Sequence, residues 1–175
     1  MSAILAVDPG LTRCGYAVLD GDKPLAFGHF TSAAGDDPAH RVGQIAAGLN
    51  ALVEEHKPTL IALERVFANS NLKSVMGVAQ ISGALMATAF AKEIPVEFFT
   101  PSEVKAAVTG NGRADKQQVS FMVAKQLGLT EIPGPADVAD ALAVALCAQR
   151  RSQSFSTPAR QKWVAAQKKA KPRIG

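Results

Sequence analysis

The sequence predicts an α/β domain built on a five-stranded mixed sheet, in the strand order 3-2-1-4-5, with helices on both faces. Three observations predict this class: three apolar strands open the chain as a meander, two more strands alternate with helices, and the remainder is helical. Right-handed crossovers then lay strands four and five parallel to strand one. The chain direction therefore switches between strands one and four, which are neighbours.

The predicted strands are short apolar runs bounded by turn residues. In order they are "AILAVDPG", "CGYAVLDG", "PLAFGHFTS", "TLIALE" and "VEFFT". The first ends in an Asp-Pro-Gly turn, and "DGDKP" joins the second to the third. Open α/β sheets bind ligands at the carboxyl ends of strands beside such a switch, where Asp8 and Glu64 end strands one and four.

Amphipathic and apolar stretches predict the helices. We expect them at about 37–57, at about 71–92, from Pro101, at about 114–127, and from about Ala136. Polar residues and prolines after about 151 argue against order there. We therefore expect one domain over residues 1–150 and a basic, flexible tail over residues 151–175.

Composition fits a globular protein, and charge is unevenly distributed. Hydrophobic residues make up 47% of the 175, and the formal net charge is +4. Eight of the 19 basic residues lie from Arg150 onward, where no acidic residue occurs, so residues 1–149 carry a net charge of −4. A basic tail on an acidic body suggests a polyanionic partner, although a merely solubilising tail explains it equally well.

The chain shows none of the usual signs of export or membrane insertion. Its start lacks a signal peptide, and no apolar run reaches the roughly 18 residues that a membrane span needs. Cys14 and Cys147 fit neither a disulfide framework nor a zinc site. We expect a cytoplasmic protein that makes no membrane contact.

Four acidic residues form the candidate site. Singly, each has an ordinary explanation: Asp8 initiates a turn, Glu64 ends a strand beside Arg65, and Asp137 and Asp140 suit the first turn of a helix. Jointly, the topology carries Asp8 and Glu64 to one sheet edge, and a helix starting after "IPGP" can deliver the other two. Crowded carboxylates repel unless a cation sits among them, and oxygen ligands suit Mg²⁺ or Mn²⁺. Two such ions make a phosphodiester-cleaving site.

Four sequence blocks resemble the RuvC family of bacterial Holliday-junction resolvases, in the RNase H-like superfamily. They are "AVDPGLTRCGYAV", "IALERVF", "KAAVTGNGRADKQQV" and "ADVADALAVA", and the similarity runs from about Ile4 to Ala148. The resemblance implies an RNase H-like nuclease domain and places the four catalytic, metal-binding acids on Asp8, Glu64, Asp137 and Asp140. It further implies a homodimer that uses Mg²⁺ or Mn²⁺ to nick two opposing strands of a four-way DNA junction. Such an enzyme works with the RuvAB branch-migration complex, in recombination and repair at the nucleoid.

The same resemblance singles out residues around the acids. Lys116 would support catalysis, and Lys105 would contact a phosphate; two glycines in "TGNGRADK" let the backbone and Arg113 approach phosphate too. Phe67 would stack on bases near the crossover. The helix at about 71–92 would form the dimer contact.

One departure and two alternatives accompany this interpretation. Many members of the family carry an arginine where this chain has Ser82, so the DNA contacts near that helix are open. A related RNA-processing nuclease remains an alternative within the same class of enzyme. A phosphate-binding ATPase is a second alternative, although the chain is short for the two domains that such an enzyme closes around ATP. A non-catalytic junction-binding module would be favoured if any one of the four acids were missing.

Overall fold

The structure is a computed structural model that describes residues 2–65 and 72–154. Five strands, β1 (Ile4–Asp8), β2 (Arg13–Asp20), β3 (Lys23–Thr31), β4 (Leu60–Glu64) and β5 (Val96–Phe99), form a sheet in the order β3-β2-β1-β4-β5. β1 pairs antiparallel with β2 and parallel with β4, and β4 pairs parallel with β5. The predicted order and the switch beside β1 are confirmed.

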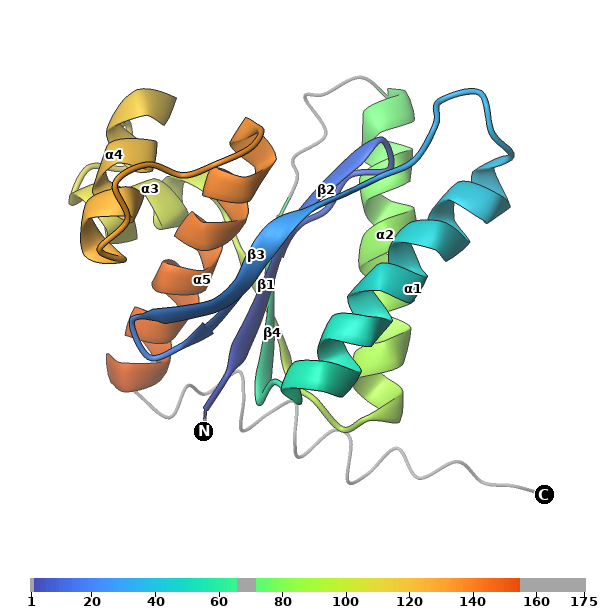
Figure 1. Cartoon of the computed structure of the whole chain (residues 1–175), viewed down its shortest axis with the longest axis horizontal. Helices are drawn as coiled ribbons and strands as arrows, with labels where there is room; N and C mark the ends of the chain where they lie inside the picture. The colour runs from blue at the N-terminus through green and yellow to red at the C-terminus, as the bar shows by residue number, and fades with distance from the viewer. Residues whose placement is uncertain (1, 66–71, 155–175) are drawn as a thin grey trace.

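Five helices cover the two faces of this sheet (Figure 1). α1 (Pro38–His56) and α2 (Leu72–Ala91) lie on one face. α3 (Pro101–Thr109), α4 (Lys116–Gln126) and α5 (Ala136–Ser154) lie on the other. The predicted helices are thus present: the starts at Pro101 and Ala136 match, and the other predicted ends differ by one or two residues.

Capping side chains explain where three helices begin. Asp37 accepts hydrogen bonds from the first backbone amides of α1. Thr100 and Glu103 form a capping box at the start of α3, and Asp115 and Gln118 form another at α4. Because Asp115 is the cap, α4 begins at Lys116, two residues later than the apolar pattern alone indicates.

α5 is the helix that holds the site against the sheet. Every residue from Val138 to Ala148 except Asp140 is buried. The helix is apolar nearly all round because it is sandwiched between the strands on one side and α3 and α4 on the other. A second core, which includes Ile45, Leu49 and Ile81, lies between the sheet and α1 and α2.

α5 also carries the folded chain past the expected domain boundary. The helix runs to Ser154, and Arg151 lies over the Phe99 ring at 4.2 Å while donating to Glu103 Oε1 at 3.0 Å. Arg150 donates to Gln126 Oε1 at 2.8 Å. The boundary expected at residue 150 therefore falls inside α5, and these two arginines contact the domain instead of belonging to the tail. Residues 155–175 lie outside the described part of the chain.

α2 is an unusually apolar helix. Its segment Ser74–Ala91 has a mean hydropathy of 1.4 and is long and apolar enough, by length and composition alone, to cross a membrane; 28% of it is buried. The expectation that no segment reaches this length is wrong. Ile81, Leu85 and Ala89 pack into the core beneath the sheet, so α2 is a core helix on that side.

Candidate active site

The fold gathers the four predicted acids at one end of the molecule. Asp8 and Glu64 are the last residues of β1 and β4, which are parallel neighbours and so end at the same sheet edge. α5 begins at this edge (Figure 1). Asp137 lies in the first turn of this helix, and Asp140 lies one turn later.

Gly15 is what lets α5 approach the sheet so closely. It stands opposite Asp8 in the β1–β2 register, and a Cβ there would collide with the backbone carbonyl of Asp137. Only glycine leaves room for the helix backbone at this point. The close approach carries Asp137 toward Asp8, which feels the charges of both Asp137 and Asp140.

Asp8 and Glu64 form a tightly coupled pair of carboxyl groups. Burial, followed by the neighbouring Glu64 charge, raises the pKa of Asp8 to about 9. Burial likewise raises the pKa of Glu64, although its hydrogen bond with Asp8 acts in the opposite direction. In the metal-free site, Asp8 therefore holds a proton that it shares with Glu64 near neutral pH.

The two aspartates of α5 are each accompanied by a basic side chain. Arg13 Nε lies 3.1 Å from Asp137 Oδ2, without hydrogen-bond geometry, so this buried oxygen accepts no hydrogen bond from the described residues. Lys116 Nζ donates to Asp140 Oδ2 at 3.1 Å. The Asp140 charge raises the pKa of Lys116, which keeps the ammonium charged.

A cleft of about 240 Å³ opens beside these groups, between α3, α4 and α5. Four of its lining residues are predicted site residues, namely Glu64, Lys105, Lys116 and Asp140. Both lysines lower the pKa of Glu64 through their charge, which shows that they act on the acidic site. Two cations and a set of carboxylates around one cleft suit a phosphate held next to metal ions.

The remaining predicted residues fall less centrally. Arg113 is exposed in the turn before α4, where its backbone N–H donates to Asn111 Oδ1, and it does not line the cleft. Ser82 is 7% exposed and lines a neighbouring cavity of about 280 Å³ with Glu64 and Arg65. Phe67 lies outside the described residues.

Arg13 is the residue of the site that the sequence analysis missed. It belongs to the quoted block "AVDPGLTRCGYAV", but neither its spacing nor its charge indicates that the start of β2 meets the first turn of α5. The available signal was Gly15 within an otherwise well-formed strand, because a strand glycine often marks a close backbone approach.

The donor set fits divalent cations, although it is not a closed metal centre. In the part of the chain that the structure describes, no three His, Cys, Asp or Glu side chains stand close enough together to be a preformed set of ligands. The donors are all carboxylate oxygens, which suit Mg²⁺ or Mn²⁺. The buried, unbonded Asp137 Oδ2 and the proton retained on Asp8 both indicate that the site needs more positive charge than Arg13 and Lys116 supply.

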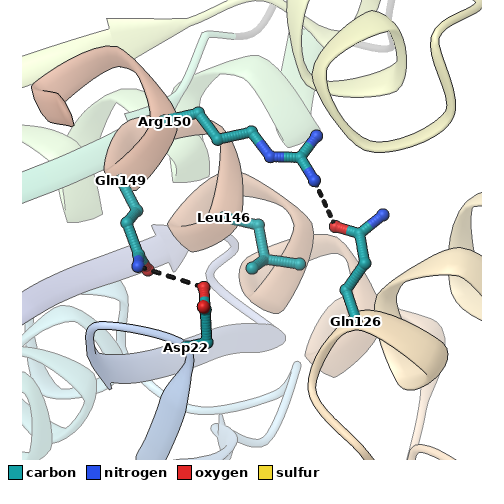
Figure 2. A pocket seen from close by; sticks show the side chains of 5 residues that line it. All are labelled: Asp22, Gln126, Leu146, Gln149 and Arg150. Carbon is teal, nitrogen blue, oxygen red and sulfur yellow. Dashed lines mark hydrogen bonds between the residues drawn. The ribbon is translucent and has the colours of Figure 1, made fainter. Parts of the chain in front are cut away.

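A further cavity is remote from this chemistry. A hollow of about 300 Å³ lies near the carboxyl end of α5. There Gln149 Nε2 donates to Asp22 Oδ1 at 3.2 Å and Arg150 donates to Gln126 (Figure 2). Asp137 and Asp140 lie at the opposite end of α5, so this hollow is not part of the candidate active site.

The chain is similar to known proteins of one family. A family described as crossover junction endodeoxyribonuclease RuvC matches residues 4–148. Crossover junction endodeoxyribonuclease RuvC of Frankia alni is 48% identical over 149 residues, which cover 82% of this chain and 76% of the relative.

Two solved structures show the same fold. The Thermus thermophilus RuvC structure has a TM-score of 0.80 at 30% identity, covering 87% of this chain and 96% of that chain. T. thermophilus RuvC in complex with Holliday junction substrate has a TM-score of 0.78 at 29% identity, with the same coverage of both chains. The RNase H-like fold expected from the sequence is confirmed. With its matched span reaching from β1 to the buried part of α5, the chain belongs to the RuvC family of crossover junction endodeoxyribonucleases.

Proposed function

We propose that this chain resolves four-way (Holliday) DNA junctions by paired symmetric nicks, through two-metal-ion hydrolysis of phosphodiester bonds, in homologous recombination and DNA repair. One observation carries the proposal: Asp8, Glu64, Asp137 and Asp140 converge on one sheet edge beside a cleft lined by Lys105 and Lys116. The names of the relatives and the junction complex of one of them support the choice of substrate.

The four carboxylates would hold two Mg²⁺ ions, with Mn²⁺ a plausible substitute. When bound, such ions supply an activated water for in-line attack and stabilise the departing oxygen. Asp8 would give up its proton to serve as a ligand, because a ligating carboxylate must be ionised. Asp137 would contribute the oxygen that now accepts no hydrogen bond.

Basic and aromatic side chains would position the DNA strand. Lys116 has a side chain that is 74% exposed and a raised pKa, so it can reach a non-bridging oxygen as a full positive charge. Lys105 would contact a phosphate from the same cleft. Arg113 would meet the backbone further out, and Phe67 would stack on a base at the crossover.

A homodimer through α2 would match the two-fold junction. Met76, Met86 and Phe90 are 59%, 39% and 54% exposed, and their spacing places them along one side of α2. The RuvAB branch-migration complex is the proposed partner. The proposed location is the cytoplasm, in association with the nucleoid.

The test compares a synthetic four-way junction with a linear duplex of equal length, in Mg²⁺, Mn²⁺ or EDTA. We expect paired nicks at symmetric positions of the junction, lost in EDTA and in Asp8→Asn, with the duplex left intact. Equal cutting of duplex and junction would contradict junction selectivity. Preferential cutting of single-stranded RNA would instead favour the RNA-processing relative.

A further inference from the structure

A second, larger cavity lies on the opposite side of the carboxylates from Lys105 and Lys116. Its volume is about 590 Å³, and it is open to the surface and lined by the β1–β2 turn, the start of α1 and the first turns of α2. Figure 1 shows α1 and α2 on the sheet face opposite α3 and α4. Asp137 lines this cavity, whereas Asp140 lines the cleft on the other side, and Glu64 lines both that cleft and the smaller cavity beside Ser82. The acidic cluster therefore stands between two openings.

Arg13 lines this cavity and has N–H donors beyond the one beside Asp137. Its side chain is 55% exposed, and its described contact is the ion pair between Nε and Asp137 Oδ2. A guanidinium carries five N–H donors in a planar fork, so its terminal nitrogens can serve a second anion while Nε stays beside Asp137.

Arg41 lines the same cavity and is held by neutral groups. Its Nε donates to Ser32 Oγ at 3.0 Å, and its Nη2 donates to Thr12 Oγ1 at 3.0 Å. Ser32 in turn donates to the carbonyl oxygens of Leu11 and Thr12, which ties the turn to this arginine. Among the described residues, no carboxylate lies within ion-pair distance of Arg41, although the cavity leaves it room for one.

Arg41 is thus a pre-positioned guanidinium without a counter-charge. It shares the cavity with Arg13 and with the hydroxyls of Thr12 and Ser74, and this set of groups has the chemistry of an anion site. A single carboxylate or a free ion would satisfy the charge. The cavity lies beside Asp137, and the cleft with Lys105 and Lys116 lies beside Glu64 and Asp140. This arrangement instead favours a charged polymer that passes over the acids.

We propose that Arg13 and Arg41 form a phosphate subsite that binds the DNA backbone on the α1–α2 side of the carboxylates. The proposal rests on the proposed function, since its ligand is a phosphodiester of the strand being cut. The strand would be held by Lys105 and Lys116 on one side of the acids and by the two arginines on the other. Two anchors fix the phosphate between them more tightly than one anchor can.

The first measurement is binding of a labelled four-way junction in EDTA, where no cleavage occurs and metal loading plays no part. We expect Arg13→Gln and Arg41→Gln each to weaken binding about tenfold, because a hydrogen-bonded contact to a charged group is lost. The slope of log K against log salt should become shallower by about 1 for each variant. Arg13→Lys, which keeps the charge, should retain part of the affinity.

The matched control is Lys23→Gln, which removes one positive charge from the exposed first residue of β3, at the other end of the sheet. We expect it to bind as the wild-type chain does. Thermal unfolding of every variant separates lost contacts from misfolding, and this matters most for Arg41, which also ties the turn together.

The second measurement locates the phosphate. Neutral methylphosphonates replace the phosphates of one junction strand in turn, close to the crossover. At one or two positions the wild-type chain should lose about tenfold in affinity, and Arg13→Gln should lose nothing further there, as a direct contact requires.

The outcomes separate the two proposals. A wild-type chain that neither binds nor cuts junctions contradicts the proposed function itself. A wild-type chain that does both, while Arg13→Gln and Arg41→Gln behave like Lys23→Gln, overturns the subsite alone. So does a methylphosphonate penalty that persists unchanged in Arg13→Gln, because the arginine then acts only on Asp137.

Discussion

At the scale of single residues, the proton held by Asp8 makes the stability of the metal-free protein depend on pH. The pKa of Asp8 is about 9 in the folded chain and 3.8 in the reference state, with burial as the main cause. The folded state therefore binds more protons than the unfolded state between these values. The free energy of unfolding falls as pH rises through this window, by up to about 1.4 kcal/mol per pH unit for one proton.

This predicts that Asp8→Asn makes the protein more stable than wild type in EDTA at pH 8, and that the difference shrinks toward pH 4. Urea unfolding between pH 4 and 9 measures it. Asp36→Asn, at an exposed position in the loop before α1, should keep the wild-type pH profile. If Asp8→Asn and wild type show parallel profiles, Asp8 does not hold the proton.

Gly15 carries a second prediction at this scale. Gly15→Ala places a methyl group against the Asp137 carbonyl, and the resulting overpacking should cost about 1–3 kcal/mol of unfolding free energy. Displacement of Asp137 should also lower junction cleavage by about 100-fold, because a shift of about 1 Å is enough for that loss. Chemical denaturation and single-turnover cleavage check the two effects.

The control for Gly15 is Gly43→Ala, in the interior of α1. A Cβ there meets nothing within 4 Å, so this variant should gain about 0.5–1 kcal/mol and keep its activity. A neutral effect of Gly15→Ala on both stability and cleavage would show that α5 can move away from β2 without consequence.

At the scale of elements, local sequence signals predicted the strands, most helix bounds and the convergence of Asp8 and Glu64, but not the contacts between distant elements. Apolar runs and turns located all five strands, and the parallel pairing of β1 with β4 placed Asp8 beside Glu64. The ends of helices depend on contacts that are distant in sequence. α5 continues to Ser154 because Arg151 packs on Phe99 of β5, a pairing that no local pattern contains.

The same reasoning explains why Arg13 escaped prediction. Its contact with Asp137 joins the start of β2 to the start of α5, 124 positions further along the chain. Only the packing depth of α5, set by Gly15, decides whether these two side chains meet. Spacing within a helix predicted that Asp137 and Asp140 face the same way, but not which cations accompany them.

The exposed side of α2 supports a prediction about assembly. Phe90→Glu places a charge on an apolar surface that also includes Met76 and Met86, so we expect it to dissociate the proposed dimer. Phe121→Glu is the matched control, because Phe121 is 67% exposed on α4, on the other face of the sheet. Sedimentation at several concentrations should show a monomer for Phe90→Glu and a dimer for wild type and control. A monomeric wild type at concentrations that cut junctions would contradict the dimer.

At the scale of the whole molecule, charge separates into an acidic site and basic surroundings. The body up to residue 149 carries a net −4, yet the openings on either side of the acids are lined by Lys105, Lys116, Arg13 and Arg41. Binding a polyanion to a net acidic body calls for additional positive charge. The sequence supplies it after α5, where residues 155–175 contain six basic residues and no acidic ones.

Truncation after Ser154 tests this division, and the position of the cut matters. A cut after Arg150 would remove Arg151 and its contacts with Phe99 and Glu103, and so would damage the domain as well as the tail. The chain ending at Ser154 should unfold at the wild-type temperature but bind the junction more weakly at 150 mM salt. Its slope of log K against log salt should be shallower by as much as about 5, if each of the six charges meets a phosphate.

A chain with the six basic residues replaced by Gln is the control for length: it should match the truncated chain, because the effect is electrostatic. An unchanged slope in both would leave the tail without a role in DNA binding and would assign the affinity to the two clefts alone.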